Sequence, residues 1–195
     1  VLTSSFFKYI LWPMKSETFK PPIRTLMGPG PSDVSKRVLD AMARNTIGHL
    51  DPYFVSMMDD TKKLLRYAFQ TNNDLTFAVS APGSAGMECC FVNLVEPGDK
   101  VIICQNGYFG DRMKENVERC GGIAVVVHDD WGTKIDICKV ETTLKENPDA
   151  CILAFVHAET STGVKSDPKD LVDLAHQHDC LTICDTVTGL AGIPL

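Results

Sequence analysis

The stretch that decides the fold is LTICDTVTGLAGIPL, residues 181–195. It opens with a short apolar run, the length of a buried strand, which ends on the carboxylate of Asp185. A charge at the carboxyl end of a buried strand lies at the crevice where open α/β sheets bind ligands. No Lys or Arg follows Lys169 to neutralise this carboxylate. Two interpretations are open: a cationic ligand faces Asp185, or Asp185 caps a turn by accepting backbone hydrogen bonds.

Upstream of this stretch, the chain repeats a strand, a glycine-bearing turn and a helix. Short apolar, β-branched runs predict five strands, at residues 75–80, 101–105, 123–128, 151–157 and 181–185. Helical patterns occupy the intervals between them: at residues 85–94, after the NGYFG segment to about residue 119, and at residues 135–145 and 169–176. Strands that alternate with helices indicate crossover connections. We therefore predict an α/β fold built on a doubly wound, mostly parallel sheet.

The first third of the chain is expected to be helical and loop-like. Residues 1–20 are set aside as an N-terminal extension, either a targeting segment or non-native sequence. A proline- and glycine-rich loop follows at residues 20–31. A helix capped by Ser32 or Asp33 is predicted to run to Ala43, and a long amphipathic helix is predicted at residues 53–69.

Composition narrows the classes of function. The formal net charge is −6 and no basic patch is present, so a nucleic-acid partner is not expected. No run of 18 apolar residues occurs, so no membrane span is expected. The eight cysteines include no CxxC pair, which disfavours a zinc site and is typical of reduced thiols in an intracellular protein. We expect no metal and a small-molecule ligand.

Three further predicted strands end in unusual loops. After the first, Pro82, Gly83 and Ser84 precede a helix, where free N–H groups can bind a phosphate; the alternative is a plain tight turn. After the second, the two aromatic residues Tyr108 and Phe109 lie between glycines and can stack on a flat ligand or pack under the loop. After the fourth, the hydroxyls around Ser161 can bind a ring oxygen or cap the next element.

The four strand ends together describe one ligand. They offer a phosphate site, a stacking surface, hydroxyl groups and a carboxylate for a ring cation. Pyridoxal phosphate has all of these features, and its pyridinium nitrogen is commonly paired with an Asp. The sequence therefore predicts pyridoxal 5′-phosphate as cofactor.

Several motifs also carry a family resemblance. The segments GPGPSDVSKRVLDAM, LTFAVSAPGSAGMECCFVNLVEPGD, NGYFGDR, HAETSTGV and CLTICDTVTGLAGIPL occur in this order. They resemble the class V pyridoxal-phosphate aminotransferases, and most of all the alanine–glyoxylate and serine–pyruvate aminotransferase group, which includes 3-hydroxykynurenine transaminases. The resemblance runs from about residue 23 to residue 195. It implies a fold-type I enzyme, with residues 21–195 as the N-terminal arm and the first part of its cofactor-binding large domain.

The resemblance also implies roles for individual residues. Those expected at the cofactor are Pro82, Gly83, Ser84, Phe109, Ser161, Asp185 and Val187, with Phe109 stacked on one ring face and Val187 on the other. Those expected at the substrate are Gly30, Gly48, His49 and Ser161, some of them reaching it across a dimer interface. The chain departs from many relatives in having Phe109 in place of Trp and Ser84 in place of His.

The family's Schiff-base Lys is expected roughly two dozen residues beyond the position of Asp185. We therefore expect an inactive, truncated N-terminal fragment that holds no catalytic residue and that aggregates or folds only partly by itself. The whole protein is expected to be a homodimer that moves an amino group from alanine or serine to glyoxylate, converting an amino acid and a 2-oxo acid. The alternatives are a class V lyase resembling the cysteine desulfurases, and a non-catalytic doubly wound binding module. The resemblance further implies a peroxisomal or mitochondrial location, with the cytoplasm as the alternative.

Overall fold

The computed structural model describes residues 18–194 of the chain. The chain divides into two compact units, Val1–Ala43 and Arg44–Leu195. The boundary expected between residues 20 and 21 falls inside the first unit and stays a prediction.

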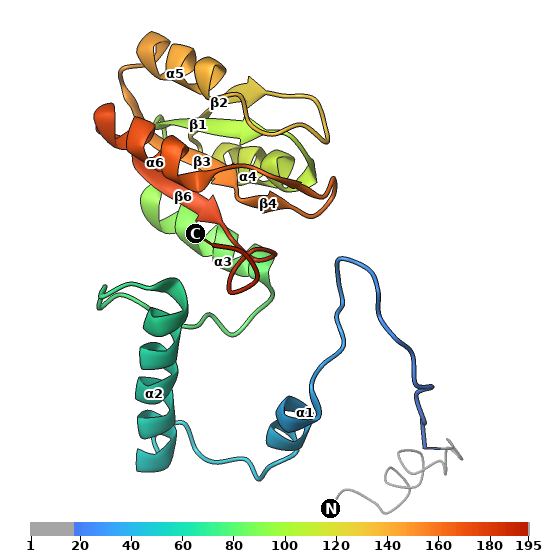
Figure 1. Ribbon diagram of the computed structural model, residues 1–195. Coiled ribbons are helices and arrows are strands. Elements are labelled where there is room, and N and C mark those ends of the chain that lie inside the picture. The colour runs from blue at the N-terminus through green and yellow to red at the C-terminus, as the bar shows by residue number, and fades with distance from the viewer. Residues whose placement is uncertain (1–17, 195) are drawn as a thin grey trace, which may run out of the picture. The chain divides into compact units, whose positions relative to one another are not determined.

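A four-stranded parallel sheet forms the centre of the second unit (Figure 1). Its strands lie in the order β2-β1-β3-β6. Their bounds are Ile123–His128 for β2, Lys100–Gln105 for β1, Ala150–Val156 for β3 and Leu181–Asp185 for β6. The expectation of a doubly wound parallel sheet is confirmed, because helices connect successive strands and cover both faces.

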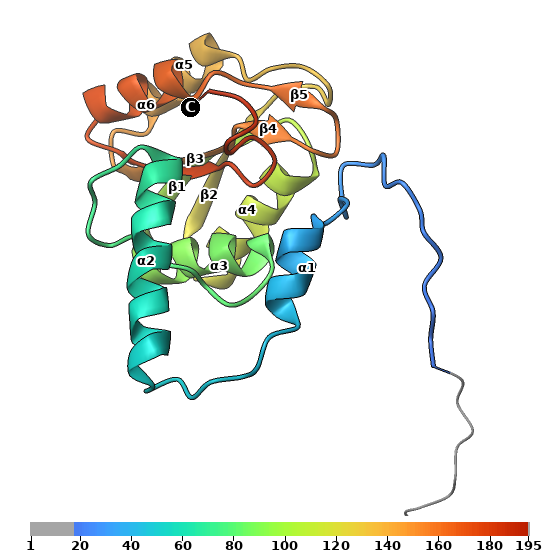
Figure 2. The same cartoon turned by 60° about the horizontal axis from the view of Figure 1, so that its bottom comes forward.

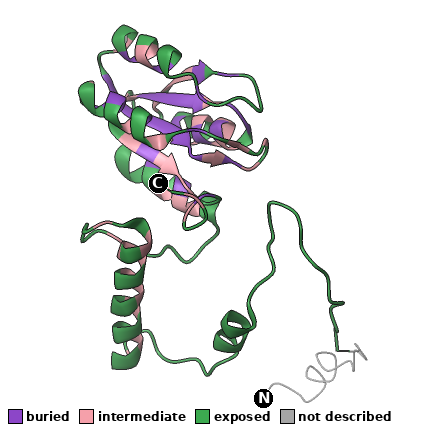
Figure 3. Ribbon diagram, viewed as in Figure 1, coloured by how far each residue is buried: buried purple, intermediate pink, exposed green. Residues whose placement is uncertain are grey.

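Strict alternation along the strands divides the core into two layers. On one face, Ile102 and Phe155 pack against α5 and α6; on the other, Ile103 and Ala154 pack against α3 and α4. The bounds of these helices are Gly83–Leu94 for α3, Tyr108–Arg119 for α4, Ile137–Glu146 for α5 and Pro168–Gln177 for α6. Figure 2 shows the sheet between the two pairs of helices, and Figure 3 shows that the buried residues concentrate on the strands.

The remaining elements lie outside this layered core. Helix α1 spans Lys36–Met42 in the first unit, and all of its residues are exposed. Helix α2 spans Pro52–Phe69 in the second unit and has no fully buried residue. A short antiparallel hairpin, β4 at Ala158–Glu159 and β5 at Val164–Lys165, follows β3. None of the helices in residues 18–194 is long and apolar enough to cross a membrane.

Two expectations about elements are wrong. Residues 75–80 form no strand, and Leu75 and Phe77 are exposed. A β-strand requires backbone hydrogen bonds to a neighbouring strand, and no described segment pairs with residues 75–80. The first helix is not capped by Ser32 or Asp33: its N-cap is Ser35, and the carboxylate of Asp33 instead accepts a hydrogen bond from the Leu26 N–H.

Candidate functional site

The direction in which strands are added reverses between β1 and β3. Strand β2 joins one side of β1, whereas β3 and then β6 extend the sheet on the other side. Right-handed crossovers then require helices on opposite faces, which explains why α4 and α5 cover different layers. The loops after β1 and β3 diverge at this point. Open α/β sheets bind ligands in the resulting crevice, at the carboxyl ends of the strands.

A cavity of about 210 Å³ lies at these strand ends. Its lining combines the start of α3 with the segments that follow β1, β3 and β6. The lining residues are Gly83, Ser84, Met87, Phe109, Val156, Ala158, Thr160, Asp185, Val187 and Thr188. Five residues predicted from sequence for the cofactor therefore meet at one cavity.

Asp185 supplies the negative charge of this cavity. Its Oδ1 accepts a hydrogen bond from the Val187 N–H at 2.9 Å, so Asp185 caps the turn as one of the two interpretations predicted. Partial burial nevertheless raises the pKa of the Asp185 carboxyl; the Val187 N–H opposes that shift, and the charge of Glu159 adds to it. No cationic side chain of residues 18–194 pairs with Asp185. The capping bond satisfies one lone pair and leaves the charge without a counter-ion.

The start of α3 forms the second wall. The helix begins at Gly83 after the N-cap Pro82, whose side chain can make no capping hydrogen bond. The first N–H groups of a helix have no intrahelical acceptor, and the helix dipole favours an anion beside them. Gly83 also approaches the segment after β6 closely: a Cβ added at this residue would lie 2.8 Å from Val187 Cγ2. Pro82 lies next to the cavity in sequence but does not line it.

Two apolar side chains line the cavity. Phe109, in the first turn of α4, is half-buried and packs against the core layer that contains Met113. Its ring meets that of Tyr108 edge to face, with centroids 5.4 Å apart. Val187 is 72% exposed and therefore free to pack on a ligand. A flat ring between Phe109 and Val187 would bury the apolar faces of both side chains.

The structure places Ser161, the hydroxyl-bearing residue predicted at this site, outside the cavity lining. Ser161 does not line the cavity: its Oγ donates to Glu159 Oε1 at 2.7 Å and accepts from the Tyr108 N–H at 3.0 Å. The hydroxyl-bearing residue of this turn that lines the cavity is its neighbour Thr160. The role of Ser161 at the cofactor stays a prediction, and the geometry favours Thr160 for direct contact.

The structure does not bring the residues predicted for the substrate to the cavity. Gly48 and His49 are exposed in the loop before α2. Gly30 belongs to the other unit. Their roles stay predictions.

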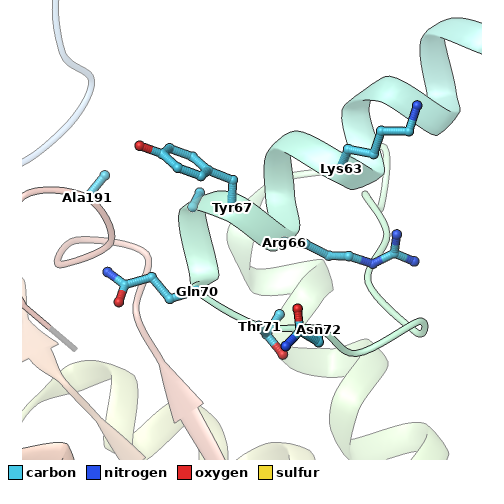
Figure 4. A pocket seen from close by; sticks show the side chains of 8 residues that line it. Lys63, Arg66, Tyr67, Gln70, Thr71, Asn72 and Ala191 are labelled. Atoms are coloured by element: carbon cyan, nitrogen blue, oxygen red, sulfur yellow. The ribbon is translucent and has the colours of Figure 1, made fainter.

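A larger hollow lies elsewhere in the second unit, at the end of α2 (Figure 4). It is lined by Lys63, Arg66, Tyr67, Ala68, Gln70, Thr71, Asn72 and Ala191. None of these residues was predicted to be functional. The guanidinium of Arg66 donates hydrogen bonds to the backbone carbonyls of Asn73 and Asp74. The donors it uses there are not available to bind an anion in the hollow. Among the residues that the structure describes, no group of three His, Cys, Asp or Glu side chains could hold a metal.

Pyridoxal phosphate fits the donors and acceptors of the cavity at the strand ends. The unpaired carboxylate of Asp185 matches a ring cation, and the start of α3 matches a phosphate. Phe109 and Val187 match the two faces of a ring, and Thr160 offers a hydroxyl. Sequence reasoning missed Thr160 and the buried Glu159. Both lie in the quoted HAETSTG segment, but a tight turn has no periodicity from which to read side-chain direction.

The chain matches the model of the family "Aminotransferase class-V" over residues 26–195. Among curated relatives, alanine–glyoxylate aminotransferase of Oryctolagus cuniculus is 38% identical over 174 residues, 89% of this chain and 44% of the relative. The (S)-ureidoglycine–glyoxylate transaminase of Bacillus subtilis is 35% identical over 171 residues, 88% of this chain and 41% of the relative. The chain thus spans less than half the length of these relatives.

Solved structures agree with this match. The crystal structure of alanine–glyoxylate aminotransferase from Nostoc sp. has a TM-score of 0.90 and 42% identity. The match covers 93% of this chain and 48% of that protein. The ureidoglycine–glyoxylate aminotransferase of Bacillus subtilis has a TM-score of 0.88 and 34% identity, and the match covers 91% of this chain and 46% of that protein.

Proposed function

The chain belongs to the class V aminotransferases, and from this premise we propose that the whole protein transfers an amino group from alanine or serine to glyoxylate with pyridoxal 5′-phosphate as cofactor. The names of the relatives support glyoxylate as acceptor, since both the rabbit and the Bacillus subtilis proteins are named for it. Alanine is supported by the first of these names, and serine by the family resemblance alone.

The observation that carries the proposal is the carboxylate of Asp185. It is partly buried, its pKa is raised, and residues 18–194 provide no cation for it. A protonated pyridine nitrogen would supply the missing positive charge, and the carboxylate would keep that nitrogen protonated. When bound, pyridoxal phosphate provides the electron-withdrawing ring that amino transfer requires.

The other residues of the cavity hold and orient this group. The N–H groups at the start of α3, around Gly83 and Ser84, bind the phosphate. Phe109 and Val187 enclose the ring and exclude water from its faces. Thr160 lines the cavity, which supports a role for its hydroxyl in orienting a ring substituent. The chain's own contribution is thus binding, orientation and the charge at the ring nitrogen.

We also infer that the whole protein is a homodimer. Gly48 and His49 are exposed and lie outside the cavity wall. If they contact substrate, as the resemblance implies, a second subunit has to present them. The compartment, peroxisome or mitochondrion, stays a prediction that rests on the resemblance alone.

The test compares Asp185→Asn with the matched control Asp173→Asn in the whole protein. Asp173 is an exposed residue of α6 that pairs with Lys169 and does not line the cavity. With alanine and glyoxylate, pyruvate formation by Asp185→Asn should fall by roughly 100-fold or more, because the preorganised charge is lost. The control should retain its rate. If wild-type protein supplied with the cofactor forms no pyruvate from alanine and no hydroxypyruvate from serine, the proposal is wrong.

A further inference from the structure

Glu159 is a buried acidic residue to which neither the sequence nor the family resemblance gave a role. It ends β4, directly before the turn that carries Thr160, and only 1% of its surface is exposed. Its Oε2 accepts a hydrogen bond from the Phe109 N–H at 3.1 Å. Its Oε1 accepts from the Ser161 N–H at 3.2 Å and from Ser161 Oγ at 2.7 Å. Both carboxyl oxygens are therefore engaged, and they join two loops that lie 50 residues apart in sequence.

The neighbouring backbone is shaped around this carboxyl group. A Cβ added at Gly107 would lie 2.3 Å from Glu159 Cγ and 2.7 Å from Ser161 Oγ. Only a glycine leaves room for the carboxyl group beneath the start of α4. The Tyr108 N–H extends the same network by donating to Ser161 Oγ at 3.0 Å. The first N–H groups of α4 thus find acceptors on the turn after β3, where an acidic group also suits the helix dipole.

We propose that Glu159 is a positioning residue of the cofactor site: by accepting hydrogen bonds from the backbone of Phe109 and Ser161, it fixes the aromatic side chain of Phe109 and the turn residue Thr160 at the cavity. This proposal rests on the proposed function, because it takes the cavity to hold the pyridine ring. Glu159 itself does not line the cavity and touches neither ring nor phosphate. It acts through its two neighbours.

The chemistry explains why an acidic residue occupies this position. A buried carboxyl group is costly unless its lone pairs are satisfied, so it persists where it organises several donors at once. A neutral side chain of the same shape, Gln, has only one acceptor atom and would point an N–H₂ group at a backbone N–H. In addition, the charge of Glu159 helps to raise the pKa of Asp185, which places a second negative charge near the proposed ring cation.

The experiment measures binding of pyridoxine 5′-phosphate to the whole protein. This ligand has the ring and phosphate but no aldehyde, so it reports the non-covalent site alone and needs no turnover. Glu159→Gln should raise its Kd about tenfold, the loss expected for one hydrogen bond to a charged acceptor. The induced circular dichroism per mole of bound ligand should also change, because the ring and Phe109 no longer keep their mutual orientation. Glu146→Gln, an exposed residue at the end of α5, is the matched control and should equal wild type in both readings.

The outcomes separate the two proposals. Failure of wild-type protein to bind the ligand would remove the premise and this inference with it. If wild type binds and Glu159→Gln has the same Kd and the same dichroism, Glu159 does not position the site, even if its Tm falls. Should Glu159→Gln not fold, Ser161→Ala carries the test, because it removes the shortest hydrogen bond to the carboxyl group. An unchanged dichroism in Ser161→Ala would then overturn the inference.

Discussion

At the scale of single residues, two acidic side chains at the site have opposite surroundings. Glu159 accepts three hydrogen bonds and is almost wholly buried. Asp185 accepts one, from the Val187 N–H, lines the cavity, and has no cationic partner among residues 18–194. A satisfied carboxyl group stabilises the fold around it, whereas an unsatisfied one is a cost that a ligand can relieve. This contrast distinguishes a positioning group from a binding group.

The first prediction is that Asp185→Asn stabilises the ligand-free protein at pH 7. Asn keeps the acceptor for the Val187 N–H but removes the unpaired charge. Because the side chain is only partly buried, we expect a gain of about 1 kcal/mol, or roughly 2–4 °C in Tm. The same variant should lose ligand binding, so stability and function change in opposite directions.

The pH dependence of this effect has a definite sign. The pKa of Asp185 is raised in the folded protein, so the folded state binds the proton more tightly than the unfolded state. Wild type and variant should therefore be equally stable below about pH 4, near the unfolded pKa. The difference in stability between wild type and variant should grow as pH rises above the unfolded pKa of Asp185 and reach its full size above the raised folded pKa. Thermal melts from pH 3 to pH 8 measure it, and a gap that is largest in acid would contradict the burial argument.

The second prediction separates Thr160 from Ser161. Thr160→Ala should weaken binding of pyridoxine 5′-phosphate by about 3- to 10-fold, the range for one neutral hydrogen bond. That loss should disappear with the analogue that lacks the ring hydroxyl, because the contact is direct. Ser161→Ala should lower affinity for both ligands equally, because its hydroxyl acts through Glu159. If the coupling to the ring hydroxyl is found at Ser161 instead, the sequence-based assignment is right and the geometric one is wrong.

Part of the predicted site meets at the cavity: five of the seven residues predicted for the cofactor line it, whereas Pro82 and Ser161 do not. The residues that strand ends and family motifs predicted and that line the cavity are Gly83, Ser84, Phe109, Asp185 and Val187. Ser161, which the family resemblance implied, does not line the cavity, whereas its neighbour Thr160 does, because adjacent side chains in a tight turn diverge in ways that no periodic pattern describes. Glu159 was not identified because its burial depends on Gly107, which lies 52 residues earlier in the chain.

At the scale of elements, prediction succeeded where a segment's own pattern determines its partners. The strands β1, β2, β3 and β6 and the helices between them match the predicted ranges within about three residues. The segment 75–80 has an equally clear strand pattern, yet it remains irregular. A ladder requires a second strand, and residues 18–194 provide none for it. Pattern alone predicts the capacity to form a strand and not the presence of its neighbour.

The third prediction uses two glycines on helices of the same face. Gly110 on α4 lies against β1, where an added Cβ would be 2.9 Å from the Cys104 carbonyl oxygen and 3.0 Å from Gln105 Cα. Because both neighbours are backbone atoms, Gly110→Ala should cost about 1–3 kcal/mol by overpacking. Gly86 on α3 has nothing within 4 Å of that position, so Gly86→Ala should gain about 0.5–1 kcal/mol from helix propensity.

Chemical denaturation of both variants gives the comparison. The difference in sign is the informative quantity, since each variant adds the same single methyl group. If Gly110→Ala is no more destabilising than Gly86→Ala, α4 does not pack against β1 as closely as the distances at Gly110 indicate.

At the scale of the whole molecule, the doubly wound order and the location of the site have one cause. The reversal between β1 and β3 puts α4 and α5 on opposite faces and separates the loops after the two strands. The segments that follow these strands carry Phe109, in the first turn of α4, and Thr160, and β6 adds Asp185 at the same cavity. The alternation of strand and helix in the sequence predicts the architecture, but the strand order that creates the crevice depends on long-range pairing.

The last prediction concerns the open edge of the sheet. Strand β6 pairs only with β3 among residues 18–194, and its first residue, Leu181, is 57% exposed. An unpaired edge with an exposed apolar residue is a template for pairing with another copy. We therefore expect the 195-residue chain to self-associate, and Leu181→Lys to reduce this association because a charge on an edge strand repels a second edge. Leu50→Lys makes the same change at a more exposed leucine, 81% accessible, in a loop without strand structure, and should leave the association unchanged. Sedimentation velocity over a concentration series measures both; equal effects of the two variants would mean that general surface hydrophobicity, and not the β6 edge, drives the contact.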